Sequence, residues 1–162
     1  MERHLDPRGL GDHLDRLFRA AWALCGSRED AEDLVQETYA RVLARPRLLR
    51  NEDDLGYLLR ALRNTYLTAR RTESRRPRTA PMSEGRDPVE RRPDLDPEAA
   101  FAARQVYAAV ANLPDDFRDV IVAVDVAGLS YREAAKALKT REGTVMSRLY
   151  RARNQVAAQL DG

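Results

Sequence analysis

The sequence predicts an all-α protein built from two small helical domains that a flexible linker joins. Only 6% of the 162 residues are aromatic while 33% are charged, and Ala, Leu, Arg and Glu dominate, which favours helices over a sheet. Apolar residues recur at three- and four-residue steps along most of the chain. One long polar stretch interrupts this pattern. The hydrophobic content of 43% suffices for two modest cores.

The first two expected helices meet at Gly26. Over residues 12 to 25 the apolar positions form a single stripe, and Gly26 ends this helix. Ser27 stands three residues before Asp30, a variant of the capping box, and opens a second helix that Pro46 closes. The residues expected on the inner sides of these two helices are Leu14, Leu17, Phe18, Ala21, Leu24, Ala31, Leu34, Val35, Tyr39, Val42 and Leu43.

A third helix is expected after an irregular polar stretch from Pro46 to Asp54. Its apolar side carries Leu55, Leu58, Leu59, Leu62 and Tyr66, and it completes a first domain over residues 1–72. Residues 73–95 are rich in Pro, Arg, Ser and acidic residues. Because they have almost no apolar side chains to bury, they cannot offset the entropy of becoming ordered. We therefore expect a flexible linker there.

The second domain is expected over residues 96–162. An Ala-rich helix spans 98–111, and Pro114 stands in the first turn of the next helix, which Gly128 ends. Two further helices follow, so this domain is also a small bundle.

The last two of these helices have the spacing of a helix-turn-helix. Ser130 and Glu133 form a capping box for a short helix, Lys139 and Thr140 make the turn, and Thr140 can cap the final helix. The apolar positions expected on the inner face of that helix are Val145, Leu149, Ala152, Val156 and Leu160.

The outward face of the final helix has side chains suited to reading duplex DNA. In a helix-turn-helix the second helix enters the major groove, where Arg bonds guanine and Ser bonds several base edges or phosphates. The residues alone leave two interpretations open: a regulator whose helix-turn-helix binds duplex DNA, for example an operator bound as a dimer, and an interaction module whose basic face is solvated surface. The outward residues are Arg141, Glu142, Thr144, Met146, Ser147, Arg148, Tyr150 and Arg151.

The sequence lacks the usual marks of an enzyme, a metal protein or a membrane protein. His4 and His13 lie near the N-terminus, Cys25 is the single cysteine, and no Gly-rich phosphate loop, zinc spacing or nucleophile motif occurs. The N-terminal residues lack an apolar signal-peptide core, and no stretch approaches the roughly 18 apolar residues of a membrane span. We expect a cytoplasmic, non-enzymatic protein with no cofactor, no metal and no membrane insertion.

Two separate segments resemble the extracytoplasmic-function (ECF, group IV) sigma factors of the sigma-70 family. The segment GLSYREAAKALKTREGTVMSRLYRAR resembles region 4 of that family, and LPDDFRDVIVA, which precedes it, resembles the family's LP-x-x-x-R-x-V segment. In the first domain, LCGSREDAEDLVQETYARV is similar to region 2, and YLLRALRN is similar to the segment that follows it. The resemblance thus covers both domains, in the family's order.

The resemblance implies a sigma factor that binds bacterial RNA polymerase core, directs it to promoter DNA and is held inactive by an anti-sigma factor. Region 2 would dock on the clamp of the largest subunit, and region 4 on the flap of the second subunit. The residues implied for the clamp are Glu32, Asp33, Gln36 and Glu37.

The resemblance also implies two DNA-binding sets. Region 2 would melt and read the minus 10 element, for which a basic helix face suits a separated strand. Region 4 would read the minus 35 duplex. The chain departs from the family at Met146, where Lys or Arg is usual, at Lys139, where Gly is common, and at Tyr57, where Trp is usual. The minus 10 set is Arg60, Arg63, Asn64, Thr68 and Arg71; the minus 35 set is Arg141, Thr144, Met146, Ser147, Arg148, Tyr150 and Arg151.

Overall fold

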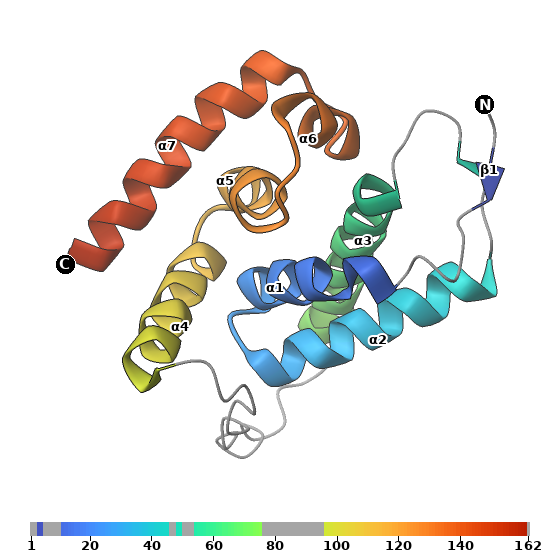
Figure 1. The fold of residues 1–162 in the computed structure, drawn as a ribbon, viewed down its shortest axis with the longest axis horizontal. Coiled ribbons are helices and arrows are strands. Elements are labelled where there is room, and N and C mark those ends of the chain that lie inside the picture. Colours follow the sequence, from blue (N-terminus) through green and yellow to red (C-terminus); the bar gives the residue numbers. More distant parts are fainter. Residues whose placement is uncertain (1–2, 5–10, 46–47, 50–53, 76–95, 162) are drawn as a thin grey trace.

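The structure is a computed structural model that describes residues 3–4, 11–45, 48–49, 54–75 and 96–161. Figure 1 shows a chain of helices, which confirms the expected all-α class. Of the expected linker, only residues 73–75 fall within the described part, and they are helical. The elements are α1 (Leu14–Cys25), α2 (Arg28–Ala44), α3 (Asp54–Arg75), α4 (Pro97–Ala111), α5 (Asp115–Ile121), the π-helical η2 (Val122–Val126), α6 (Tyr131–Ala137) and α7 (Glu142–Asp161).

Capping residues set most of the helix ends where the sequence placed them. Gly26 adopts a left-handed φ of 74° after α1, and its amide donates to the carbonyl oxygen of Trp22 at 2.7 Å. The Ser27 hydroxyl accepts a hydrogen bond from the backbone N–H of Asp30. These bonds confirm the boundary between the first two helices.

The capping box before α6 is also confirmed. The Ser130 hydroxyl accepts from the Glu133 backbone N–H at 3.1 Å, and the Ser130 backbone N–H donates to the Glu133 carboxylate at 2.9 Å. Two neighbouring helices begin one residue later than expected. Pro114 is the N-cap of α5 and lies outside its first turn, and α7 begins at Glu142, so that Arg141 immediately precedes it. Such shifts are ordinary because helix ends depend on local backbone geometry.

A two-residue antiparallel pairing was not expected from the sequence. Strand β1 (Arg3–His4) pairs with β2 (Leu48–Leu49), with Arg3 opposite Leu49. Strand β2 lies within the stretch from Pro46 to Asp54 that the sequence marked as irregular. Two acidic residues of that stretch, Glu52 and Asp53, fall outside the described residues, whereas Asp54 is the first residue of α3, where an acidic side chain favours a helix N-terminus.

Each half of the chain forms its own layer of packed helices. In the first half α1, α2 and α3 pack together around Leu17, Leu58 and Leu62. In the second half α7 lies across α5 and α6, with Val145 and Leu149 almost fully buried. The helical stripes expected from the sequence are therefore largely confirmed, because burial of an apolar stripe is what makes such helices stable.

Three leucines expected in the core are instead exposed. Leu14 is 44% exposed, Leu43 is 51% exposed and Leu160 is 45% exposed. All three lie in the first or last turns of their helices. Periodicity identifies the side of a helix that faces the core, but it does not tell where along the helix the neighbouring helix ends.

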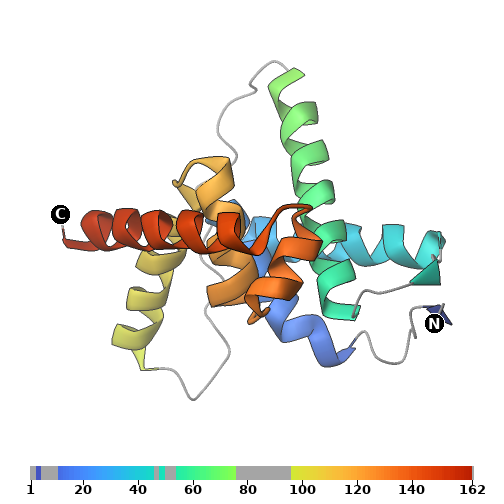
Figure 2. The ribbon, with the colours of Figure 1, turned by 90° about the horizontal axis from the view of Figure 1, so that it is seen from above.

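The two halves pack against each other and share one continuous hydrophobic cluster. Figures 1 and 2 show α1 between α2 and the second half, and α1 contacts both α4 and η2 while α3 contacts α6. At this junction the ring of Trp22 from α1 stacks on the ring of Tyr107 from α4, with centroids 4.7 Å apart. The sequence indicated two domains but no contact between them.

Lys139 provides a test of backbone strain in the turn between α6 and α7. It has a φ of 54°, the only left-handed value at a non-glycine residue in the described part of the chain. Because a side chain in this region costs about 1–2 kcal/mol, the Lys139→Gly variant should gain about 0.5–1 kcal/mol in the free energy of unfolding, measured by urea denaturation. The matched change Lys136→Gly, inside α6, should instead lose about 1 kcal/mol. A loss at Lys139→Gly would contradict the strained turn.

Candidate binding surfaces

The four polar residues of α2 singled out by the sequence are all exposed, and they border two different hollows. Glu32 and Gln36 border an apolar pocket of about 610 Å³ between α1, α2 and α4. Asp33 and Glu37 border a more polar pocket of about 500 Å³ between α2 and α3. One face of α2 therefore presents carboxylates beside an apolar surface, which suits a basic partner that also has apolar side chains.

Local ion pairs on this α2 surface are weak. Glu37 lies 2.9 Å from Arg41 and Glu32 lies 3.8 Å from Arg28, each one turn apart on the helix. Exposed pairs of this kind contribute only about 0.3–0.5 kcal/mol. A partner with basic groups can therefore displace them at little cost.

The five residues of α3 expected to hold a DNA strand do not share one environment. Asn64, Thr68 and Arg71 are exposed, and the Thr68 hydroxyl donates to the Asn64 carbonyl oxygen at 2.9 Å. Arg60 is half-buried. Arg63 turns toward the second half of the chain, where its Nε donates to Oδ2 of Asp119 at 2.8 Å. The structure thus divides this set into three exposed residues, the half-buried Arg60, and Arg63, which is paired with α5.

Asp119 is a charged residue in a largely buried position. It is 8% exposed. Burial raises the pKa of its carboxyl above the usual range, and the neighbouring Arg63 guanidinium opposes this shift only in part. An ion pair in such a position contributes less to the stability of the fold than its short distance suggests. The reason is that removing the two charges from water offsets most of their attraction.

The outward face of α7 is exposed as the sequence predicted. Tyr150 is 70% exposed and Met146 is 53% exposed, while Arg141, Ser147 and Arg151 are also exposed. The helix buries Val145, Leu149 and Ala152 on its opposite side. This face can therefore approach a DNA major groove without disturbing the core.

Two members of the α7 set are partly engaged within the chain. Arg148 is half-buried, and its guanidinium lies 3.7 Å from the Asp116 carboxylate of α5. Thr144 is also half-buried, and its carbonyl oxygen accepts a hydrogen bond from the Ser147 hydroxyl at 3.3 Å. Both remain at the edge of the exposed face. Arg148 is therefore better placed for a phosphate than for a base edge.

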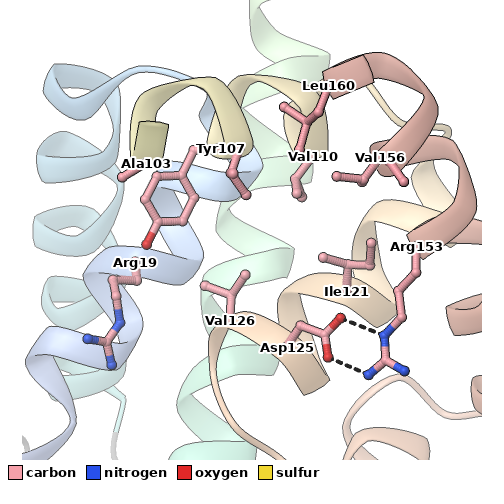
Figure 3. Close-up of a pocket in the computed structure, with 12 residues that line it drawn as sticks. Arg19, Ala103, Tyr107, Val110, Ile121, Asp125, Val126, Arg153, Val156 and Leu160 are labelled. Carbon is pink, nitrogen blue, oxygen red and sulfur yellow. Dashed lines mark hydrogen bonds and ion pairs between the residues drawn. The ribbon is translucent and has the colours of Figure 1, made fainter. Parts of the chain in front are cut away.

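An ion pair that the sequence did not predict ties α7 to η2. Both Nε and Nη2 of Arg153 donate to the Asp125 carboxylate, at 2.9 and 2.7 Å. Figure 3 shows this pair at the edge of an apolar pocket of about 670 Å³, which Val156 and Leu160 of α7 also line. The aspartate hydrogen bonds raise the pKa of Arg153 further, so it stays charged. No sequence pattern connects positions 125 and 153, so only the fold reveals the pair.

Cys25 lies beside the polar pocket between α2 and α3. Burial, with smaller contributions from Asp30 and Glu73, raises the pKa of its thiol to about 12. Because the thiolate is the nucleophile, alkylation by iodoacetamide at pH 8 should be about 1000-fold slower than for a free thiol with a pKa of about 8.5. Mass spectrometry of the native chain measures the rate, and urea-unfolded chain is the control. Equal rates in the two states would contradict the buried thiol.

The part of the chain that the structure describes shows neither a candidate metal site nor a membrane-spanning helix. No group of three or more His, Cys, Asp or Glu side chains there could hold a metal ion. Among the described helices, none is long and apolar enough to cross a lipid bilayer. The surfaces of α2, α3 and α7 therefore remain the candidates for function.

Comparison with known protein families matches two models to the chain. The model "Sigma-70 region 2" covers residues 10–76, and "Sigma-70, region 4" covers residues 103–156. The first match contains α1, α2 and α3, and the second contains α6 and most of α7, the two helices of the helix-turn-helix. Together the two models account for most of the chain.

Curated relatives carry the same description. The ECF RNA polymerase sigma factor SigE of Mycolicibacterium smegmatis is 36% identical over 149 residues, which are 89% of this chain but 57% of that relative. The factor EcfG of Rhodopseudomonas palustris is 32% identical over 86% of this chain and 76% of its own length. The chain thus spans little more than half of the first relative and about three quarters of the second.

Solved structures share the fold. The sigma factor RpoE of Bartonella quintana, solved in complex with the anti-sigma factor NepR, matches with a TM-score of 0.69 and 25% identity over 95% of both chains. CnrH, solved in complex with the cytosolic domain of CnrY, matches with a TM-score of 0.65 at 23% identity, over 95% of this chain and 86% of that one.

Proposed function

The chain belongs to the sigma-70 family, among its extracytoplasmic-function sigma factors, and we propose that it directs bacterial RNA polymerase core to a specific set of promoters. In this role it would act in the cytoplasm, where the polymerase works, and would itself catalyse no reaction. The observation that carries the proposal is the pair of family matches, regions 2 and 4 in order on one chain, each over a separate layer of helices.

The first half of the chain is proposed to bind the polymerase and the minus 10 element. Glu32, Asp33, Gln36 and Glu37 on α2 would contact the clamp of the largest subunit; their exposure and the adjacent apolar pocket support this role. Arg60, Arg63, Asn64, Thr68 and Arg71 on α3 would hold the melted strand. Residues 1–72 would thus act as the melting domain, with residues 73–95 as a linker.

The second half, residues 96–162, is proposed to bind the flap of the second subunit and the minus 35 duplex. Its reading set is Arg141, Thr144, Met146, Ser147, Arg148, Tyr150 and Arg151, most of which are exposed on α7. Tyr150 and Met146 are well exposed, so they would meet base edges or thymine methyl groups, whereas Arg148 would hold the DNA backbone.

An anti-sigma factor is proposed as the regulator. The support is the fold shared with RpoE of Bartonella quintana, whose solved complex contains the anti-sigma factor NepR. The apolar pockets beside α4, of about 610 and 670 Å³, offer surface that a helical partner could cover.

Run-off transcription tests the proposed function. Purified core polymerase is given fragmented genomic DNA of the source organism, with and without the chain. Specific transcripts that depend on the chain support the sigma role, and their start sites disclose the promoters. If no transcript appears and the chain alone shifts duplex DNA, the stand-alone regulator replaces the sigma factor as the interpretation.

A single arginine tests the minus 35 contact. Arg151 is exposed on α7, and Arg151→Ala should weaken holoenzyme binding to a promoter duplex by about 1–3 kcal/mol, measured by filter binding at fixed salt. Arg132→Ala, an exposed arginine on α6 outside the reading set, is the control and should change binding little. Equal losses at both positions would indicate a general charge effect.

A further inference from the structure

Helix α7, the second helix of the helix-turn-helix, is held to the rest of the chain by buried apolar residues along only part of its length. Its buried positions are Val145, Leu149 and Ala152. Farther along, Val156 is half-buried and Leu160 is 45% exposed, where the helix borders the apolar pocket of about 670 Å³. The buried stripe of α7 therefore ends just before Arg153.

An ion pair lies on each flank of this buried stripe. On one flank the Arg148 guanidinium is 3.7 Å from the Asp116 carboxylate of α5. On the other flank Nε and Nη2 of Arg153 both donate to the Asp125 carboxylate of η2, as Figure 3 shows. Because an α-helix turns about 100° per residue, the two arginines project roughly 70° to either side of the centre of the stripe. Together the two pairs resist rotation of α7 about its own axis.

The two pairs differ in how firmly they fix α7. Arg153 makes two hydrogen bonds, of 2.9 and 2.7 Å, one to each carboxylate oxygen of Asp125, so its planar guanidinium has a defined direction. Arg148 makes a single contact of 3.7 Å with Asp116, whose side chain is 69% exposed. Arg148 can therefore leave its partner for a DNA phosphate at little cost, whereas Arg153 is a fixed point of the helix.

Three elements meet at Arg153. The hydrogen bonds to Asp125 raise the pKa of Arg153, and Tyr131, the first residue of α6, adds a smaller upward contribution. The carboxylate comes from η2 and the arginine from α7. A contact at this point therefore affects how both helices of the helix-turn-helix lie on the segment that precedes them.

The π-helical turn η2 determines where Asp125 lies. The Ala127 backbone N–H donates to the carbonyl oxygen of Val122, five residues earlier, at 2.8 Å. In a regular α-helix position 125 would continue the line of Arg118 and Val122, which are buried, because residues three, four and seven apart share one side. A π turn holds one residue more than an α turn, and here the Asp125 side chain is 35% exposed. The irregular turn thus puts the carboxylate within reach of Arg153.

We propose that Arg153 and Asp125 are positioning residues for the minus 35 element: their two hydrogen bonds fix the rotation of α7, and with it the direction in which its exposed side chains meet base edges. The inference rests on the proposed function, because it needs a promoter duplex to be read. Met146, Tyr150 and Arg153 follow one another at four- and three-residue steps along one side of α7, so a rotation at Arg153 moves all three in the same direction. In this role Arg153 touches no DNA.

The pair contributes to direction more than to stability. The side chains of Arg153 and Asp125 are 51% and 35% exposed, and exposed ion pairs add little to the stability of a fold. Base recognition is more demanding, because a hydrogen bond to a base edge needs the side chain at a defined distance and angle. Loss of the pair should therefore weaken the reading of the minus 35 element while the chain remains folded.

A direct phosphate contact is the alternative role for Arg153, and it makes opposite predictions. Lysine also binds phosphate, as a point charge, so Arg153→Lys would keep such a contact, but lysine cannot reproduce the two hydrogen bonds of a guanidinium to one carboxylate. Removing the Asp125 charge would strengthen a phosphate contact, because it would free Arg153 and reduce the repulsion of DNA. Under the positioning role both changes weaken recognition.

Filter binding of the holoenzyme to promoter DNA tests the proposal. One fragment carries a promoter mapped by run-off transcription, and a second carries the same sequence with the minus 35 element scrambled. Asp125→Asn and Arg153→Lys should each lower the affinity for the first fragment about tenfold, close to the effect of one mismatched base pair. Neither should change the affinity for the second fragment or the dependence of binding on salt, since no phosphate contact is lost. The double variant should lose no more than either single one.

Asp116→Asn is the matched control. It removes the same charge from α5 and breaks the other ion pair of α7, but it frees Arg148 for a phosphate. Its holoenzyme should therefore bind both fragments at least as tightly as the unmodified one. Urea unfolding followed by circular dichroism should give nearly the same midpoint for all these variants, which establishes that the fold is intact.

The proposal is overturned if Asp125→Asn binds the promoter as tightly as the unmodified chain or more tightly, or if Arg153→Lys keeps full affinity. It is also overturned if the losses are equal on the two fragments, or if they add in the double variant. Failure of the proposed function has a different signature. In that case the unmodified chain yields no transcript with core polymerase, so that no promoter fragment is obtained and both proposals fall together.

Discussion

Replacing Asp33, Gln36 and Glu37 together with alanine should lower the affinity of the chain for core polymerase about 100-fold, or about 2.7 kcal/mol. The three side chains are exposed on α2 and border the two hollows on either side of that helix. A few residues dominate most protein interfaces, and acidic residues that meet a basic partner contribute through both contact and long-range attraction. Anisotropy of the labelled chain, titrated with core polymerase, measures the affinity.

A triple variant with the same residue types serves as the control. Glu98, Gln155 and Asp161 are exposed on α4 and α7, and their replacement by alanine removes the same charge. This control should retain core binding and run-off transcription. If it loses as much affinity as the α2 variant, the effect belongs to net charge and the α2 surface is not the polymerase contact.

Trp22→Ala should destabilise the chain by about 3–5 kcal/mol, the usual range for truncating a buried aromatic residue. Trp22 is 7% exposed, and its ring lies against Tyr107 at 4.7 Å and near Phe18 at 6.0 Å. Since small domains have only about 5–15 kcal/mol of stability, this is a large fraction of the total. Urea unfolding followed by far-UV circular dichroism measures the loss, because the variant has no tryptophan left.

The conservative change Trp22→Phe tests how much of this stability comes from the packing of an aromatic ring on Tyr107. Trp22→Phe keeps an aromatic ring that can still lie on Tyr107 and should lose less than half as much. A loss below about 1 kcal/mol for Trp22→Ala would contradict the packing of α1 on α4.

The surfaces proposed for function could be located from the sequence in part. On α7 the apolar period placed Val145 and Leu149 inside, and their burial turns Tyr150 and Arg151 outward as expected. On α3 the same reasoning grouped Arg63 with Asn64, although Arg63 turns to Asp119 of a distant helix. Tyr66, which the sequence assigned to the core, is partly buried against the shared hydrophobic cluster. Periodicity assigns a residue to a side of its own helix but cannot tell which neighbour covers that side.

The sequence by itself determined most of the helices, several of their caps and the family of this protein. These properties are local. Ser130 and Glu133, three residues apart, form a capping box, and an apolar stripe or a family motif is a pattern along the chain. Only the tertiary structure decided that the two halves share a core, that Arg153 donates to Asp125, and that Arg63 donates to Asp119. Such contacts join residues far apart in the chain, and their formation depends on the packing of whole helices, which no local pattern encodes.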